Sequence, residues 1–287
     1  MLNIINNNFF TLRNMTKNKL SFNLKGFNNI DQSIYADHLV ATMDAHYHID
    51  SMKAIKERSL ALLNLTQGDY VLDIGCGLGF DTEAIAEMVG QNGFSIGIDN
   101  SKRVLIEAQE RSKYKNAFYC MGDAINLCFP DNFFSVCRAD KLLVSQTNIP
   151  QVLSEMIRVV KSGGKISVTC LDFGTITLYP GSVRQVKTII EYWQQLVENP
   201  FIGRQLLPLF TSHGLGNLTL QPEIFYIRKF STLQKIISFE KILSDMKKEK
   251  KLSEVETINL LKELKEADNE NTFYWSINLT TIVGVKS

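Results

Sequence analysis

The sequence predicts an α/β fold in which helices cover both faces of a mostly parallel sheet. Short apolar runs with strand character alternate with amphipathic helical segments at intervals of about 20–30 residues, as in successive βαβ units. The first run leads directly into a turn with glycines at alternate positions, Gly75, Gly77 and Gly79. Acidic residues also accompany the ends of the first three runs, and in a parallel sheet these ends share one edge, where ligands bind.

The first part of the chain supplies five strands and the helices around them. The expected strands are 70–74, 94–98, 117–121, 134–139 and 165–171, each rich in apolar, β-branched or aromatic residues. The expected helices are 49–65, 81–89, 101–111 and 149–160, each with apolar residues at helical spacing. Gly68, Gly90 and Gly164 mark helix ends, and Ser101 is a candidate N-cap, which places the boundaries of these elements.

The second part is less regular. A helix is expected over 183–197, a strand over 218–227, and charged helices over 231–267 with a turn at the lysine-rich stretch 247–251. Alternating apolar residues over 273–285 predict a buried final strand. Between these elements, Arg204 is as compatible with a structural salt bridge as with contact to an acidic substrate, and His213 is expected to cap a helix.

We expect one folded domain, because 287 residues suit a single large α/β unit. Its expected parts are N-terminal cap helices (31–64), a core (65–230), a helical insertion (231–271) and the final strand (272–287). Residues 1–30 are rich in asparagine and contain no acid. They are expected to form a disordered tail, with an organelle-targeting segment as the alternative.

Composition narrows the partners and the compartment. A net charge of +1 gives no reason to expect a nucleic acid or an anionic membrane as partner, and no apolar run is long enough to span a bilayer. The cysteines are Cys76, Cys120, Cys128, Cys137 and Cys170. Their number is odd and none forms a C-x-x-C pair, so we expect reduced thiols, no metal site and a cytoplasmic protein.

Asp73, Asp99 and Asp123 narrow the class of ligand. Asp99 follows Gly79 by about 20 residues, the distance at which an acid accepts hydrogen bonds from both hydroxyls of a ribose. The glycines have G-x-G-x-G spacing, which differs from the G-x-G-x-x-G fingerprint of dinucleotide sites. Asp73 precedes the turn, where its charge would repel a pyrophosphate and attract an ammonium group.

Four motifs in order resemble those of one family. The stretch VLDIGCGLG (71–79) resembles the first motif of the class I S-adenosylmethionine-dependent methyltransferases, in the small-molecule branch typified by ubiquinone and menaquinone biosynthesis ("type 11"). Residues 97–101 match the acidic second-strand motif, and 122–124 with 129–134 match the third. Residues 158–164 match the turn before the fifth strand, with Ser162 where proline is usual. The resemblance implies a Rossmann-like, doubly wound sheet of seven strands whose last strand is antiparallel, with helical cap elements.

The resemblance also implies the cofactor, S-adenosyl-L-methionine, and the residues that bind it. Gly75, Cys76 and Gly77 would approach its methionine part, while Asp73 supports the turn and the ammonium side. Cys76 is expected to fill space in the turn rather than act as a nucleophile.

The second and third motifs would hold the nucleoside. The resemblance implies that Asp99 binds the ribose hydroxyls and Asn100 packs at the adenine. After Gly122, Asp123 would accept from the adenine amino group, and the N–H of Ala124 would meet a ring nitrogen.

The stretch after the fourth strand departs from the family. Asp140 and Lys141 would face the methyl group and the substrate, but Ser145 stands where many relatives have a histidine. A general base at this place is therefore in doubt, and no catalytic residue is assigned. Methyl transfer does not require one in every case, because a sulfonium carbon is already activated and alignment supplies much of the catalysis.

These observations predict a methyltransferase that methylates a small organic molecule by direct in-line displacement. The cap would cover the substrate, and His46, Tyr47 and His48 are expected to lie in it, although solvated or hinge histidines are the simpler interpretation. The alternatives are an NAD(P)-dependent oxidoreductase and a non-catalytic protein that binds the cofactor.

Overall fold

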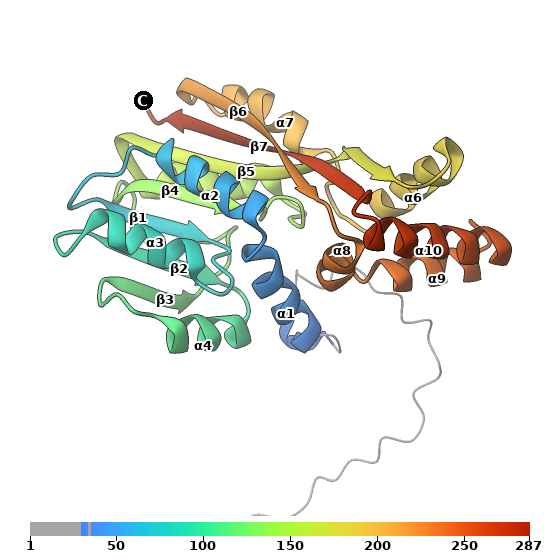
Figure 1. The fold of residues 1–287 in the computed structure, drawn as a ribbon. Coiled ribbons are helices and arrows are strands. Elements are labelled where there is room, and N and C mark those ends of the chain that lie inside the picture. The colour runs from blue at the N-terminus through green and yellow to red at the C-terminus, as the bar shows by residue number, and fades with distance from the viewer. Residues whose placement is uncertain (1–29, 34–35) are drawn as a thin grey trace, which may run out of the picture.

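A mixed sheet forms the centre of the molecule. The computed structural model describes residues 30–33 and 36–287, and within them seven strands are ordered β3-β2-β1-β4-β5-β7-β6 (Figure 1). The strands are β1 (Tyr70–Ile74), β2 (Phe94–Asp99), β3 (Ala117–Met121), β4 (Phe134–Asp140), β5 (Val160–Tyr179), β6 (Gly216–Ile227) and β7 (Tyr274–Val285). Strands β1 to β5 are parallel to one another, whereas β7 lies antiparallel between β5 and β6. The predicted sheet with a reversed last strand is confirmed.

Helices cover both faces of this sheet. In the described residues they are α1 (Ala36–Tyr47), α2 (Asp50–Ala61), α3 (Phe80–Val89), α4 (Lys102–Arg111), α5 (Ile149–Val159), α6 (Val183–Gln195), α7 (Ile202–Ser212), α8 (Phe230–Ile237), α9 (Phe239–Lys248) and α10 (Glu254–Asn269). Val71 of β1 packs with Leu60 of α2 and Ile85 of α3. Its neighbour Leu72 belongs to another core, with α5 and α7. Alternate strand residues point to opposite faces, so two layers of helices follow directly from the strand pattern.

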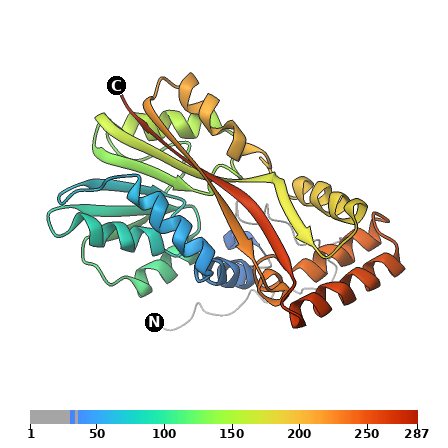
Figure 2. The same cartoon turned by 45° about the horizontal axis from the view of Figure 1, so that its top comes forward.

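A further apolar core lies where β5, β6 and β7 extend past the rest of the sheet. Helices α6, α8, α9 and α10 surround these strand ends (Figure 2). Trp193 of α6 is central, with ring centroids 5.4 Å from Phe239 and 6.1 Å from Trp275. The predicted helical insertion therefore packs against the sheet as one wall of the molecule.

The predicted end of the fifth strand, at residue 171, is wrong. β5 continues to Tyr179 after an irregularity between Asp172 and Thr177 in its pairing with β7. Within that irregularity the backbone N–H of Asn278 donates to Thr175 Oγ1 at 2.9 Å. A side chain thus replaces a backbone acceptor, which lets the ladder resume after a break that resembled a strand end in the sequence.

Most other boundaries agree with the predictions to within a few residues, but β5 begins at Val160 instead of 165, and three helices instead of two follow β6. The helix expected over 49–65 is α2, which ends at Ala61, and a separate helix, α1, precedes it and ends at Tyr47. The lysine-rich stretch 247–251 forms the end of α9 and the turn to α10, as predicted. Of the tail predicted over 1–30, residues 1–29 lie outside the described residues, whereas Ile30 is buried in a short helical turn. No helix of the described residues has the length and apolar character required to cross a membrane.

Candidate active site

One cavity of about 350 Å³ opens at the carboxyl ends of the central strands. It extends from the glycine turn after β1 to the apolar core around α6. The ten residues predicted to bind the cofactor all line it: Asp73, Gly75, Cys76, Gly77, Asp99, Asn100, Gly122, Asp123, Ala124 and Asp140. The fold therefore brings together residues from four separate strand ends.

The glycine turn holds its shape through backbone contacts with β2. The N–H groups of Gly75 and Cys76 donate to the carbonyl of Ile98 at 2.8 and 3.0 Å. Gly75 and Gly77 have φ values of +70° and +53°, which favour glycine. A Cβ on Gly77 would collide with Cε of Met43 in α1. Met43 therefore packs directly against the backbone of Gly77, where a larger residue would not fit.

Asp99 connects this turn to the start of α4. Its carboxylate accepts from the N–H of Gly77 and the N–H of Ser101, both at 3.0 Å. Burial raises the pKa of Asp99, and these N–H donors oppose that shift. Since each carboxylate oxygen has two lone-pair sites, the group can still accept hydrogen bonds from a ligand. This geometry fits a ribose diol.

Residues 122–124, which match the third motif, form a tight turn beside Asp99. The N–H of Gly122 donates to the Asp99 carbonyl at 3.0 Å, and Asp123 Oδ1 accepts from the N–H of Ile125 at 3.1 Å. Asp123 is exposed and Ala124 is buried. The segment thus offers an acid at the rim and a small buried residue beneath it, which suits the edge of a flat heterocycle.

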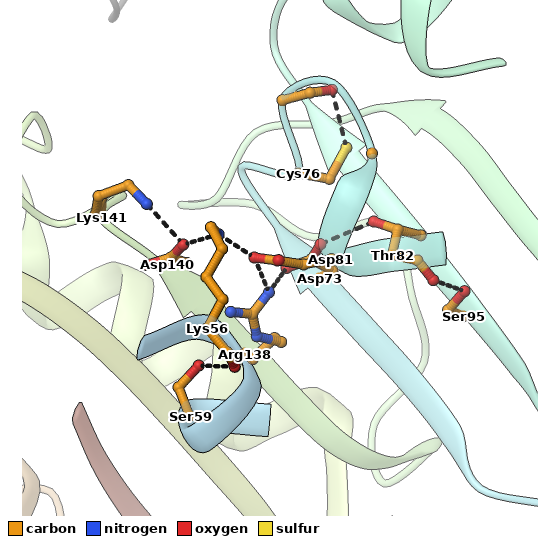
Figure 3. A network of polar contacts seen from close by, with 12 residues as sticks. Lys56, Ser59, Asp73, Cys76, Asp81, Thr82, Ser95, Arg138, Asp140 and Lys141 are labelled. Atoms are coloured by element: carbon orange, nitrogen blue, oxygen red, sulfur yellow. Dashed lines mark hydrogen bonds and ion pairs between the residues drawn. The ribbon is translucent and has the colours of Figure 1, made fainter. Parts of the chain in front are cut away.

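A largely buried chain of alternating charges, whose contacts Figure 3 shows, forms part of the cavity wall. Arg138 of β4 donates from Nη1 to Asp73 Oδ1 and to Asp81 Oδ2, both at 2.9 Å. Lys56 of α2 bridges Asp81 and Asp140 through its Nζ, 2.5 Å from each Oδ2. The ion pairs join the cap helix α2 to the glycine turn and to the end of β4.

The series of ion pairs ends at Lys141, whose Nζ lies 2.8 Å from Asp140 Oδ2. Although burial opposes the charged form of Asp140, Lys141 and Lys56 hold the pKa of this carboxyl well below its ordinary value. Burial lowers the pKa of Lys141, against the attraction of Asp140. For Lys56, Asp140 and Asp81 outweigh burial and raise the pKa. Acidic and basic side chains alternate along these ion pairs, and burial raises the pKa of Asp73 while Arg138 opposes that shift.

Asp73 is bound differently from the expectation. Its Oδ1 accepts from Arg138, and its Oδ2 accepts from Thr82 Oγ1 at 2.8 Å. The side chain thus supports the start of α3, while Arg138 offsets the negative charge that was expected to attract an ammonium group. Neither Arg138 nor Lys56 was identified from the sequence. A charged residue inside the otherwise apolar strand of Arg138 was the available signal.

His46 and Tyr47 lie in the cap and line the cavity, as one of the two interpretations expected. The Tyr47 ring stacks on Phe80 with centroids 3.9 Å apart, and His46 packs edge-on against Phe225 at 5.0 Å. Burial, assisted by the charges of Lys141 and Lys56, lowers the pKa of His46 to about 3. His46 is therefore an uncharged imidazole at neutral pH. His48 is exposed and does not line the cavity.

The end of the cavity away from the glycine turn is apolar and aromatic. We call it the aromatic lobe; it is lined by Phe173 of β5, Trp193 of α6, Phe225 of β6 and Trp275 of β7. All four are buried, and their edge-to-face contacts include Phe225 with Trp275 at 5.7 Å. The sequence analysis did not identify this lobe, because its four residues come from four separate elements.

Ser145 and Cys76 have local roles. Ser145 lines the cavity, but its hydroxyl donates to the carbonyl of Leu142 at 3.0 Å within its own turn. Burial raises the pKa of Cys76 well above its ordinary value, and a Cβ on Gly97 would lie 2.8 Å from the Cys76 sulfur. Cys76 is therefore a protonated thiol that fills space against β2.

Two residues after β5, Arg204 and His213, have local structural contacts. Arg204 binds both carboxylate oxygens of Asp172, at 2.6 and 2.8 Å. This supports the salt-bridge interpretation over a contact with substrate. His213 ends α7, and its Nδ1 lies 2.7 Å from the carbonyl of Leu209, as expected of a cap.

Comparison with known proteins gives a consistent family. Residues 65–214, just over half of the chain, match the family described as "Methyltransferase domain". A demethylmenaquinone methyltransferase of Bacillus licheniformis is 33% identical over 188 residues, which cover 59% of this chain and 80% of that protein. An uncharacterised 37.1 kDa protein of a Streptomyces fradiae transposon is 27% identical over 213 residues, covering 74% of this chain and 60% of its own length.

Solved structures share the fold at low sequence identity. The YcgJ protein of Bacillus subtilis has a TM-score of 0.56 at 17% identity, covering 80% of this chain and 98% of that one. A phosphoethanolamine N-methyltransferase 2 of Haemonchus contortus, in complex with phosphomonomethylethanolamine and S-adenosylhomocysteine, has a TM-score of 0.57 at 17% identity, covering 91% of this chain and 60% of that one. Together with the family match, these findings show that the chain belongs to the class I S-adenosylmethionine-dependent methyltransferases.

Proposed function

We propose that the protein transfers a methyl group from S-adenosylmethionine to a small, largely apolar organic molecule by direct in-line displacement. The observation that supports this is the single cavity that joins the glycine turn and Asp99 to the aromatic lobe. One end offers hydrogen-bond acceptors suited to a nucleoside, and the other offers an aromatic surface suited to a largely apolar substrate. Donor and acceptor would meet between them.

The cofactor supplies a methyl group on a positively charged sulfur. In our proposal Asp99 accepts the ribose hydroxyls, and the backbone of Gly75 and Gly77 lies against the methionine part. Asp123 and Ala124 hold the adenine edge. The main contribution of the chain is to fix the geometry and to exclude water, since alignment of two reactants can supply a large part of a barrier reduction.

The curated relatives named above include demethylmenaquinone methyltransferases, whose name denotes an apolar acceptor. The aromatic lobe agrees with an apolar substrate, and two of its four lining residues, Phe225 and Trp275, lie beyond the region 65–214 that matches the family. In our proposal, the substrate is therefore selected partly by segments outside the matched region. We also propose a cytoplasmic location, which the five free cysteines support.

Binding of the cofactor to matched variants tests the site. We expect calorimetry to detect binding of S-adenosylmethionine to the wild-type protein. Asp99→Asn should weaken this binding by about 10-fold or more, because hydrogen bonds to a charged acceptor contribute about 1.5–3 kcal/mol. Glu110→Gln, which removes an exposed acid from the helix that follows Asp99, is the matched control and should leave affinity unchanged. Equal affinity in Asp99→Asn would contradict the assignment.

Turnover tests the chemistry. Release of S-adenosylhomocysteine with one of a panel of apolar acceptors, including a demethylmenaquinone analogue, would support the enzyme. Two results would favour the alternatives. Tight cofactor binding with no release in any panel would favour a non-catalytic binding protein, and preferential binding of NAD(P) would favour an oxidoreductase.

A further inference from the structure

Lys141 lines the cavity at the end of β4, between the glycine turn and the aromatic lobe. It is the first residue after β4 and has a φ of +59°, a left-handed conformation that is uncommon for a lysine. Its backbone N–H donates to the carbonyl of Thr169 at 2.7 Å, which anchors the strained residue. Such conformations cost about 1–3 kcal/mol and persist where the surroundings enforce them, often at binding sites. The backbone therefore fixes where this side chain begins.

The neighbour of Lys141 places it next to the glycine turn. Leu142 packs over the turn, since a Cβ on Gly75 would lie 3.0 Å from Leu142 Cδ1. Lys141 itself lines the cavity, and one of its ammonium donors reaches Asp140. An ammonium group has three N–H donors. The side chain can bind Asp140 and a ligand at the same time.

Charges of opposite sign alternate around Lys141. Lys56, Arg138 and Lys141 oppose three aspartates in the buried chain. From α1, His46 faces the same cavity without charge. The other acids that line the cavity are Asp99, which backbone N–H groups bind, and Asp123 and Glu198, which are exposed.

The cofactor would add a sulfonium cation close to Lys141. A further cation at the acceptor position is unfavourable, because charge repulsion is strong where water is excluded. An anionic acceptor would pair with both the sulfonium and the lysine, and methyl transfer would then consume one charge of each sign. Methylation of a neutral amine would instead leave a cation next to Lys141. The electrostatics therefore favour an acceptor that carries a negative charge.

We propose that the methyl-accepting atom is an ionised oxygen, of a carboxylate or a phenolate, that pairs with Lys141 Nζ while the apolar part of the substrate lies in the aromatic lobe. This inference rests on the proposed methyltransferase function and names its class of substrate. In the transfer step a lone pair of the oxygen forms the new C–O bond, and the C–S bond breaks with its electrons remaining on sulfur. No proton moves, because the acceptor has already lost its proton to solvent. A general base is therefore not needed, which accounts for Ser145 in place of histidine.

The chain contains a built-in reporter for this test. Its two tryptophans, Trp193 and Trp275, both line the cavity, so quenching of tryptophan fluorescence reports binding there. Octanoate, octanamide and octylamine differ in charge at nearly constant size and absorb little light. With protein saturated in S-adenosylhomocysteine, we expect octanoate to bind about 10-fold or more tighter than octanamide, as for a hydrogen bond to a charged group. Octylamine should bind most weakly.

Two variants assign that preference to the lysine. Lys141→Met should bring octanoate within about 3-fold of octanamide, and Lys141→Arg should retain most of the preference because it keeps the charge. An undiminished preference in Lys141→Met, or a wild-type preference for octanamide or octylamine, would overturn the proposal. If Lys141→Met does not fold, the order of the three affinities in the wild type and in Lys141→Arg still tests the proposal.

Further measurements distinguish a carboxylate acceptor from a phenolate. They also distinguish failure of the inference about Lys141 from failure of the proposed methyltransferase function. The ionised form of 4-nitrophenol absorbs visible light, so its titration in the complex shows whether Lys141 stabilises a phenolate. Mass spectrometry of products then distinguishes a methyl ester from a methyl ether. Calorimetry with S-adenosylmethionine tests the proposed function separately: loss of that binding refutes the methyltransferase assignment, whereas intact cofactor binding without an anion preference refutes only the inference about Lys141.

Discussion

Replacing Gly77 by alanine separates backbone strain from loss of the cofactor site. Gly77 has a φ of +53°, and an L-residue in this region costs about 1–2 kcal/mol. The added Cβ also collides with the end of Met43, a flexible side chain that can move away at little cost to stability but that lines the cavity. We therefore expect Gly77→Ala to lose only about 1–2 kcal/mol of unfolding free energy, or about 2–8 °C in Tm for a chain of this size.

Gly77→Ala should also weaken cofactor binding, an effect that its loss of stability does not explain. The new methyl group and the displaced Met43 occupy space beside the turn, so we expect the Kd for S-adenosylmethionine to rise by about 10-fold or more, equivalent to about 1.4 kcal/mol. Gly163→Ala is the matched control, because Gly163 has a φ of +76° with no atom within 4 Å of an added Cβ. Calorimetry should show unchanged affinity in this control at a similar loss of Tm. Wild-type affinity in Gly77→Ala would refute close approach of the cofactor to the turn.

Two further predictions concern ionisable residues of the cap helices. His46 has its pKa lowered from 6.5 to about 3, so below pH 6.5 the unfolded chain binds a proton that the folded protein does not. Between pH 7.5 and 5.5 the wild type should therefore lose about 1.4 kcal/mol more unfolding free energy than His46→Gln, whereas the exposed neighbour His48→Gln should behave as wild type in urea titrations. Lys56→Met leaves Asp81 and Asp140 without their shared cation and should cost about 3–5 kcal/mol at pH 7, against less than about 0.5 kcal/mol for Lys53→Met on the same helix. This deficit should narrow as the pH falls and the carboxylates become protonated; a deficit independent of pH would show that lost packing, not charge, is responsible.

The cofactor end of the cavity was predictable because its information is local. The glycine turn and Asp99 each lie within a single strand-to-helix connection, where residue type determines backbone geometry. Parallel pairing then brings these connections to one edge, so the fold class alone implies that they meet. The buried ion pairs were not predictable in the same way. Arg138 and Lys56 lie in different elements, and the sequence does not show that both contact Asp81.

The aromatic lobe shows why the substrate is harder to read than the cofactor. Its walls depend on the register of β7 against both β5 and β6, which places Trp275 next to Leu178 on one side and Ile227 on the other. That register follows an irregularity in β5 that a side-chain hydrogen bond of Thr175 maintains. A shift of one residue in β7 would turn Trp275 to the opposite face of the sheet. The aromatic lobe, where we propose that the substrate binds, is therefore encoded in strand pairing over long sequence separations, whereas the glycine turn and Asp99 are encoded in short motifs.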